Sequence, residues 1–225
     1  YVAVDIAAAE LERALERVAA GYPATEVIGI VTDLTRSFDS SRDVAAGRDL
    51  DLGRDLDDGA VIFFYPGSSI GNFVPDDAVR FLRAIRVQCR GSGSGLLIGV
   101  DTEKDAARLR AAYDDATGIT AAFNRNVLNH VNRVLGTRFD PAAFEHIALY
   151  DPTPGRIEMH LEARRTQTVS IAGITRCFEP GERILTEYSY KYRPSAFTAM
   201  LHSAGFAQVR CWQDEAGDFA VYFAA

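Results

Sequence analysis

The sequence contains few cysteines, and the three present, Cys89, Cys177 and Cys211, are widely spaced. An odd number of separated thiols is typical of reduced cysteines in a cytoplasmic protein, and it argues against a disulfide framework or a zinc site. The four histidines show no metal-ligand spacing such as H-x-x-x-H and no supporting acidic cluster. We therefore expect a cytoplasmic protein without a metal centre.

Basic blocks and long apolar runs are also missing. Asp and Glu outnumber Lys and Arg by 31 to 24, so nucleic acid and anionic membranes are unsuitable partners. No run approaches the roughly 20 apolar residues of a membrane helix, and the start lacks the pattern of a signal peptide. With 225 residues, 48% of them hydrophobic, the chain can bury a sizeable core. We expect it to work as a monomer on a small molecule.

Apolar strands alternate with amphipathic helices in the first hundred residues. Strands are predicted over residues 1–6, 25–32, 61–65 and 96–101, and helices over residues 7–20 and 75–87. The continuous apolar run 61–65 is typical of a central parallel strand covered on both faces. This alternation favours an α/β fold, a doubly wound, Rossmann-like sheet with right-handed crossovers.

The pattern changes near residue 103. Residues 104–193 are predicted to form an inserted α+β lobe, with two helices followed by strands over 156–170 and 182–192. Residues 194–225 return to the core that residues 1–103 begin. They are predicted to form a helix and an antiparallel pair of terminal strands.

A glycine loop, Gly67-Ser68-Ser69-Ile70-Gly71-Asn72, follows the apolar strand 61–65. It therefore lies at the carboxyl end of a strand, where open α/β sheets bind ligands, and its glycines allow close approach of the backbone. A plain strand-to-helix turn explains the same residues equally well.

Two of the predicted strands end in aspartates, Asp5 and Asp33. A carboxylate at such a position often accepts hydrogen bonds from both ribose hydroxyls, and Asp33 with Leu34 could meet an adenine. Either aspartate alone is also explained as a solvated helix cap.

Strict alternation over residues 186–192 places Glu187 and Ser189 on one face of a strand and three tyrosines on the other. A neighbouring carboxylate and hydroxyl can hold a small ring that bears two N–H groups. An edge strand with a solvated polar face shows the same pattern. Met159 shares a face with Ile157 and Leu161, most simply a core face.

Six motifs in the same order give the chain a family resemblance over almost its whole length. They are residues 64–72, Gly99-Val100-Asp101 with Lys104-Asp105, Ala112-Tyr113-Asp114-Asp115, Thr120-Ala121-Ala122-Phe123-Asn124, Arg156-Ile157-Glu158-Met159, and Leu185-Thr186-Glu187 with Ser189 and Lys191. Together they resemble the histidine-specific Nα-methyltransferases of ergothioneine biosynthesis. The resemblance implies S-adenosylmethionine as methyl donor and three methylations of the L-histidine α-amine, which give hercynine.

The resemblance also implies roles for individual residues at the donor end. Asp5 resembles the ribose-binding acid, Asp33 and Leu34 the adenine contacts, and Gly67 a contact near the methyl donor. Leucine at position 34 replaces the phenylalanine that relatives often carry. The glycine-rich first motif of a methyltransferase is absent before the Asp5 strand. We therefore expect a truncated chain that binds the donor weakly by itself.

At the substrate end, Asn72 and Tyr113 resemble the catalytic residues that anchor the amino and carboxylate groups. Glu187 and Ser189 resemble the imidazole-binding pair, and Met159 lines the same pocket. Methyl transfer from a sulfonium needs chiefly alignment of the reacting atoms. The amine must also lose a proton, and the acceptor is left open between a tyrosine and a water.

Two alternatives remain at this point. One is a sister Nα-methyltransferase for another aromatic amino acid such as tryptophan, from which Glu187 and Ser189 would discriminate because indole offers only one N–H donor. The other is a non-catalytic binding module with the same fold.

Overall fold

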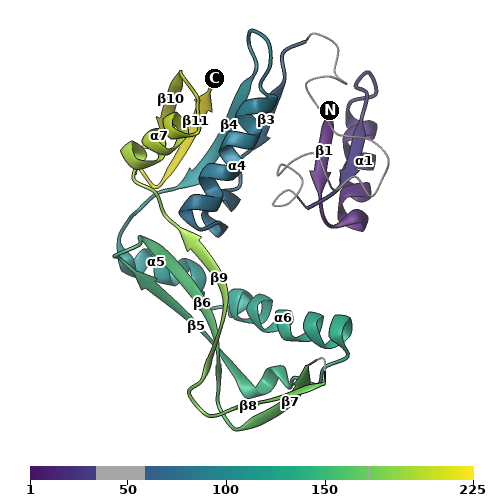
Figure 1. The fold of residues 1–225 in the computed structure, drawn as a ribbon, viewed down its shortest axis with the longest axis vertical. Coiled ribbons are helices and arrows are strands. Elements are labelled where there is room, and N and C mark those ends of the chain that lie inside the picture. Colours follow the sequence, from purple (N-terminus) through teal and green to yellow (C-terminus); the bar gives the residue numbers. More distant parts are fainter. Residues whose placement is uncertain (34–58, 172) are drawn as a thin grey trace.

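The computed structural model describes residues 1–33, 59–171 and 173–225 of the chain (Figure 1). Its first unit consists of β1 (Val2–Asp5), α1 (Ala8–Gly21) and β2 (Ile28–Val31). The two strands are parallel neighbours, with Asp5 opposite Val31. A helix that links parallel strands is the βαβ arrangement that the sequence predicts.

The larger sheet has the strand order β10-β11-β4-β3. Its members are β3 (Ile62–Tyr65), β4 (Gly95–Asp101), β10 (Val209–Gln213) and β11 (Phe219–Ala224). β3 and β4 are parallel, whereas β11 runs antiparallel to both β4 and β10. The predicted α/β class and terminal hairpin are therefore confirmed.

Two helices cover this sheet, α4 (Pro75–Gln88) and α7 (Pro194–Ser203). Both begin with proline in the first turn, where its fixed φ suits a helix and its missing N–H costs nothing. The helices and the sheet bury one apolar core, which includes Leu82, Ile98, Phe197 and Tyr222.

β3 differs from its prediction as a central strand covered on both faces. Among the described residues it pairs only with β4, so it lies at the edge of its sheet. Phe64 is 67% exposed and Ile62 50% exposed, while Phe63 and Tyr65 pack against the core. The run 61–65 is thus apolar throughout, but only one of its faces is covered by the described part of the chain.

The lower part of the molecule in Figure 1 has its own sheet, in the order β5-β6-β9. These strands are β5 (Phe144–Asp151), β6 (Arg156–Ala163) and β9 (Arg183–Tyr190). The short turn η2 (Pro141–Ala143) leads into β5, and the hairpin β7 (Gln167–Ile171) and β8 (Ile174–Phe178) connects β6 with β9. β5 and β8 were not predicted.

Helices α5 (Ala106–Tyr113) and α6 (Ile119–Leu135) pack on one face of this sheet. Leu128 of α6 contributes to one apolar cluster with Leu161, and Leu109 of α5 to another with Ile157 and Met159. The separate sheet and clusters support an inserted lobe over residues 104–193, a division that stays a prediction.

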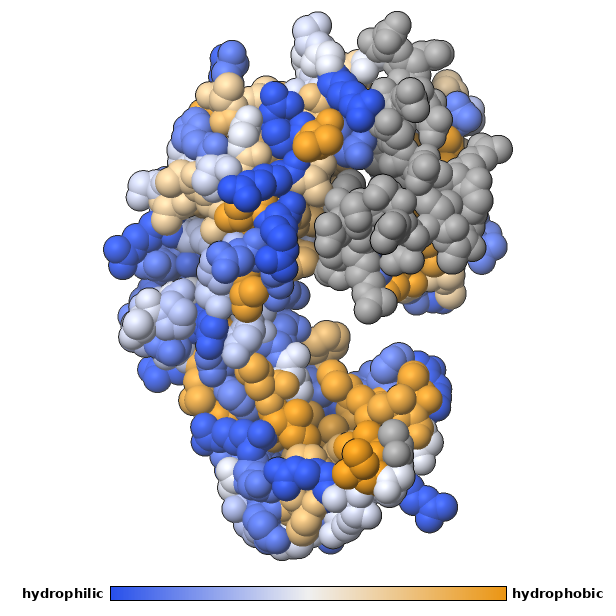
Figure 2. All heavy atoms as spheres, in the orientation of Figure 1, coloured by the Kyte–Doolittle hydropathy of each residue, from blue (hydrophilic) through white to orange (hydrophobic). Residues whose placement is uncertain are grey.

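One exposed stripe of α6 is apolar, beside exposed polar residues such as Asn126 and Asn129. Figure 2 shows hydrophobic side chains gathered over this helix, where Ile119, Phe123 and Val134 are exposed. Among the described residues, no helix is long and apolar enough to cross a membrane.

β9 belongs to both parts of the molecule, as Figure 1 shows. It pairs with β6 along its whole length, from Arg183 to Tyr190, and its end also packs against the turn η1 (Ser69–Asn72) of the glycine loop. A Cβ added to Gly71 would lie 2.7 Å from the carbonyl oxygen of Tyr190. Glycine is therefore required there, because the glycine loop and β9 meet backbone to backbone.

Gly71→Ala should therefore destabilise the protein by about 1–3 kcal/mol, since a backbone atom cannot move away cheaply. Gly21→Ala is the matched control, because a Cβ at Gly21 meets nothing within 4 Å. Urea denaturation of both variants measures the difference. Equal stability of the two variants would show that the contact between Gly71 and Tyr190 is not tight.

Candidate functional site

Glu187, Ser189 and Met159 lie on one face of the lower sheet. Met159 is directly opposite Glu187 across the β6-β9 pair, and Ile157 is opposite Ser189. Directly opposed residues share a face, and α5 covers this face through Leu109. The predicted sharing of a face by Glu187 and Ser189 is thus confirmed. The face is partly covered: Ser189 is buried, whereas Glu187 is partly exposed on β9, the edge strand of this sheet among the described residues.

A β-bulge directs Glu187 to this face. Ile184 pairs with Leu161 and Leu185 with His160, but the next pair is Glu187 with Met159, so Thr186 is an extra residue. Regular alternation from Ile184 would place Glu187 on the opposite face. The bulge lets Ile184 pack in the lobe core and still turns Glu187 inward.

The carboxyl group of Glu187 is partly buried and makes no hydrogen bond or ion pair within the described part of the chain. Burial raises its pKa above the ordinary value, and the nearby positive charge of Lys191 opposes that rise. A desolvated carboxylate beside a hydroxyl is typical of a binding site.

Ser189 belongs to a buried hydrogen-bond network at the junction with the larger sheet. Its Oγ lies 2.7 Å from the phenol oxygen of Tyr113. Lys191 Nζ donates to Ser189 Oγ at 2.9 Å and to the Tyr113 oxygen at 2.7 Å, and it pairs with Asp101 Oδ2 at 2.8 Å. The network thus joins the end of β4 to α5 and β9.

Asp101 accepts a second cation, Lys104, at 2.6 Å. Burial alone would raise the pKa of the Asp101 carboxyl, but the bonds from Lys104 and Lys191 hold it below its ordinary value. Asp101, Lys104 and Lys191 occur in the recognised motifs, yet sequence reasoning gave them no role. Asp101 and Lys104 are close in the chain, but the partners of Lys191 at Asp101 and Tyr113 are far from it, so no local pattern indicates the network.

Tyr113 is also fixed from its backbone side. His146 Nε2 lies 2.7 Å from the Tyr113 carbonyl oxygen, and Asn124 Nδ2 lies 2.9 Å from His146 Nδ1. Since a carbonyl only accepts and an amide nitrogen only donates, Nε2 of His146 donates to Tyr113 and Nδ1 accepts from Asn124. Asn124 also donates to the His160 carbonyl. The motif residue Asn124 therefore positions Tyr113 through His146.

The glycine loop approaches the same region. Ser68 has a left-handed backbone with φ 58°, and its Oγ accepts the Asp101 N–H at 2.8 Å. Asn72 is exposed at the end of η1, next to the contact between Gly71 and β9. A Cβ at Gly67 would meet only Ser69 Oγ, at an ordinary 3.7 Å. Packing within the described residues thus does not require glycine at position 67.

The two aspartates predicted at strand ends follow neighbouring parallel strands. Asp5 is exposed, and one of its carboxylate oxygens accepts the Ala7 N–H at 2.8 Å before α1. Asp33 is partly buried two residues beyond β2. Leu34, the third predicted contact of the donor, lies outside the described residues.

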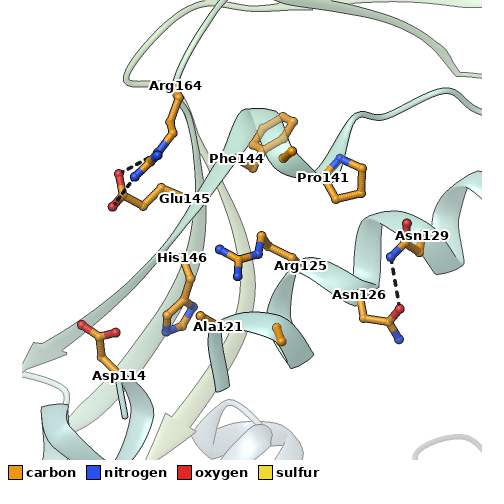
Figure 3. Close-up of a pocket in the computed structure, with 12 residues that line it drawn as sticks. Asp114, Ala121, Arg125, Asn126, Asn129, Pro141, Phe144, Glu145, His146 and Arg164 are labelled. Carbon is orange, nitrogen blue, oxygen red and sulfur yellow. Dashed lines mark hydrogen bonds and ion pairs between the residues drawn. The ribbon is translucent and has the colours of Figure 1, made fainter. Parts of the chain in front are cut away.

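A cleft of about 760 Å³ opens elsewhere on the lobe, between α6 and β5. Figure 3 shows the ion pair of Arg164 with Glu145 on its rim and Arg125 beside His146. None of the predicted site residues lines this cleft. Among the described residues, no group of three or more His, Cys, Asp or Glu side chains could hold a metal ion.

The sequence matches, over residues 1–225, the family model described as histidine-specific methyltransferase, SAM-dependent. The chain belongs to this family. The network of Tyr113, Ser189, Lys191 and Asp101 is thus built from residues of the motifs that carry the family resemblance.

Named relatives agree with the family. A histidine N-alpha-methyltransferase of Mycobacterium tuberculosis is 47% identical over 169 residues, which is 74% of this chain and 52% of that protein. One of Mycolicibacterium smegmatis is 40% identical and matches 100% of this chain and 66% of that protein. Ergothioneine biosynthesis protein 1 of Schizosaccharomyces pombe is 29% identical, over 99% of this chain and 28% of that protein. The chain therefore spans between about half and just under two thirds of the mycobacterial proteins.

Glu187→Gln should stabilise this methyltransferase at neutral pH. Because burial raises the pKa of the Glu187 carboxyl, the folded state binds its proton more tightly than the unfolded state. Ionisation of Glu187 therefore lowers the free energy of unfolding. This loss of stability is absent below the pKa of an unfolded glutamate, about 4.3, and it grows as the pH rises through the higher pKa of the folded state. The variant should gain little at pH 4 and most at pH 7.5.

Urea denaturation at both pH values measures this gain. Glu162→Gln serves as the control, since Glu162 pairs with Arg183 on the outer face of the same sheet. A gain for Glu187→Gln that does not depend on pH would contradict the burial of an ionisable carboxyl group.

Proposed function

We propose that the full-length protein transfers methyl groups from S-adenosylmethionine to the α-amine of L-histidine, three times in succession, and so forms the betaine hercynine for ergothioneine biosynthesis. The observation that carries this proposal is that Glu187 and Ser189 share one partly buried face of β9, with Met159 opposite Glu187. The names of the relatives support the same substrate and pathway.

An imidazole ring suits this pair. One ring N–H can donate to the Glu187 carboxylate, which recovers part of the cost of its burial. The second ring nitrogen is then available to Ser189. An indole brings only one N–H and is larger, so tryptophan would leave a polar group of the pair unsatisfied.

The main-chain end of the amino acid would be held by Tyr113 and Asn72. Tyr113 lies next to Ser189, and its phenol and backbone are both fixed by hydrogen bonds. Asn72 is exposed at the loop that packs against β9. Such rigid positioning supplies the orientation that methyl transfer requires, with the unprotonated amine held toward the methyl group.

The residues expected at the donor fit the group. S-adenosylmethionine supplies an electrophilic methyl group on a positively charged sulfur. Asp5 is exposed at the end of a strand and keeps one carboxylate oxygen that no described hydrogen bond uses, which suits a ribose hydroxyl. Gly67 has no side chain between its backbone and a ligand. Asp33 follows β2, the parallel neighbour of the strand that ends at Asp5.

The cysteines support a reducing compartment. Cys89, Cys177 and Cys211 are all free thiols. A cytoplasmic location is therefore part of the proposal.

Glu187→Ala should lower kcat/KM for histidine about ten- to hundredfold, because one ring N–H then lacks its acceptor. Tryptophan should lose less, since the vacated space admits a larger ring. The ratio of kcat/KM for the two amino acids measures the change. Glu162→Ala, on the outer face of the sheet, is the control. An unchanged ratio in Glu187→Ala would place the imidazole elsewhere.

Asp5→Asn should weaken donor binding in the full-length protein. Asparagine can still accept the Ala7 N–H, but it lacks the charge and the second acceptor that a ribose needs. Loss of a charge-assisted bond of about 1.5–3 kcal/mol corresponds to a roughly ten- to hundredfold larger dissociation constant. Calorimetry with S-adenosylmethionine measures it, with exposed Asp76→Asn as the control. Equal affinity of the two variants would remove Asp5 from the donor site.

A further inference from the structure

The ammonium group of Lys191 is completely enclosed by protein acceptors. The side chain is 1% exposed, and Nζ bonds Asp101, Tyr113 and Ser189 at 2.7–2.9 Å. An ammonium has three donors and no acceptor, so each of its N–H groups is used. Lys191 therefore cannot touch a substrate, and any effect it has on one must pass through Tyr113 or Ser189.

The two hydroxyl groups can be assigned donor and acceptor roles. Their oxygens lie 2.7 Å apart, so one of the two protons lies between them. Each oxygen already accepts an N–H from Lys191. A phenol is a stronger acid than an aliphatic alcohol, and a serine oxygen has two lone pairs. The geometry allows either hydroxyl to donate, and the greater acidity of the phenol favours Tyr113 as the donor. In that arrangement Ser189 accepts from both Tyr113 and Lys191, and both of its lone pairs are used.

We propose that Lys191 is a positioning residue that makes Ser189 a hydrogen-bond donor toward the substrate, so that the site selects a ring with an unprotonated, pyridine-type nitrogen. The inference rests on the proposed function, since it names how the imidazole is read. Neutral imidazole has such a nitrogen. Indole and the imidazolium cation have none.

The arrangement also orients the ring. Ser189 lies beside Tyr113, which is expected to hold the main-chain end of the amino acid. Ser189 therefore meets the ring nitrogen nearest the main chain, Nδ1. Nε2 carries the proton and donates to Glu187, the next residue along the same face. One tautomer of neutral histidine satisfies both groups.

A pair of ring analogues tests this directly in the full-length protein. In 3-(pyrrol-3-yl)alanine the N–H toward Glu187 is kept, and a C–H replaces Nδ1. Wild type should prefer histidine over this analogue by roughly 10- to 100-fold in kcat/KM, because the Ser189 proton would otherwise lack an acceptor.

Lys191→Met should reduce that preference to about threefold or less. Without the ammonium group, Ser189 can donate its proton to the Tyr113 oxygen. The C–H of the pyrrole ring then leaves no hydrogen-bond donor of Ser189 without an acceptor. Ser189→Ala should lose the preference too. Lys104→Met is the matched control, since Lys104 bonds Asp101 but neither hydroxyl, and it should keep the wild-type ratio.

Removing Lys191 alone leaves Asp101 with less compensation in a buried place, which destabilises a fold. The double variant Asp101→Asn/Lys191→Met removes both charges and provides a second measurement of the same ratio. A lysine with only a structural role would lower kcat/KM equally for both rings. An unchanged ratio in both Lys191 variants, with histidine methylated by wild type, would overturn this inference alone. Wild type that methylates neither ring would overturn the proposed function and this inference with it.

Discussion

The ion pair between Lys191 and Asp101 is the contact on which the arrangement of the site depends. Asp101 ends the central strand of the larger sheet, and Lys191 follows the strand β9 that the lobe contributes. Enclosing an ammonium group costs several kcal/mol of lost hydration, which only a full set of acceptors repays. The geometry of Tyr113 and Ser189 is therefore fixed by a charge that has no other stable position.

The binding face shows the opposite balance. Glu187 is desolvated without a described partner, and its raised pKa reflects this cost. Its neighbours Met159 and Ile157 are almost fully buried, whereas Glu187 itself is partly exposed. The carboxyl group of Glu187 thus lowers stability at the position where we propose that the substrate ring binds, as is common for sites selected for function.

Much of this could be predicted from local patterns. The apolar run of β4 predicted a buried strand, and the alternation in β9 predicted the shared face of Glu187 and Ser189, because strand periodicity depends only on adjacent residues. The run 61–65 was predicted as a central strand but forms the edge strand β3, because apolar composition does not report which strands are neighbours. β5 was missed because His146, Glu145 and Tyr150 interrupt its apolar pattern. The links from Lys191 to Tyr113 and from Asn124 to His146 join residues 78 and 22 positions apart, and no periodicity reports such contacts.

The bulge at Thr186 makes the strand's length part of the pocket's chemistry. Successive side chains of a strand point to alternate faces, and the extra residue places Glu187 on the same face as Ile184. Substitutions of residues beside the bulge change which side chains the face presents, but they do not change which residues point to that face. Loss or gain of one residue would exchange the inward carboxylate for its outward neighbours in a single step. Change of ring specificity in such a strand therefore has two routes, a gradual one through side chains and an abrupt one through chain length.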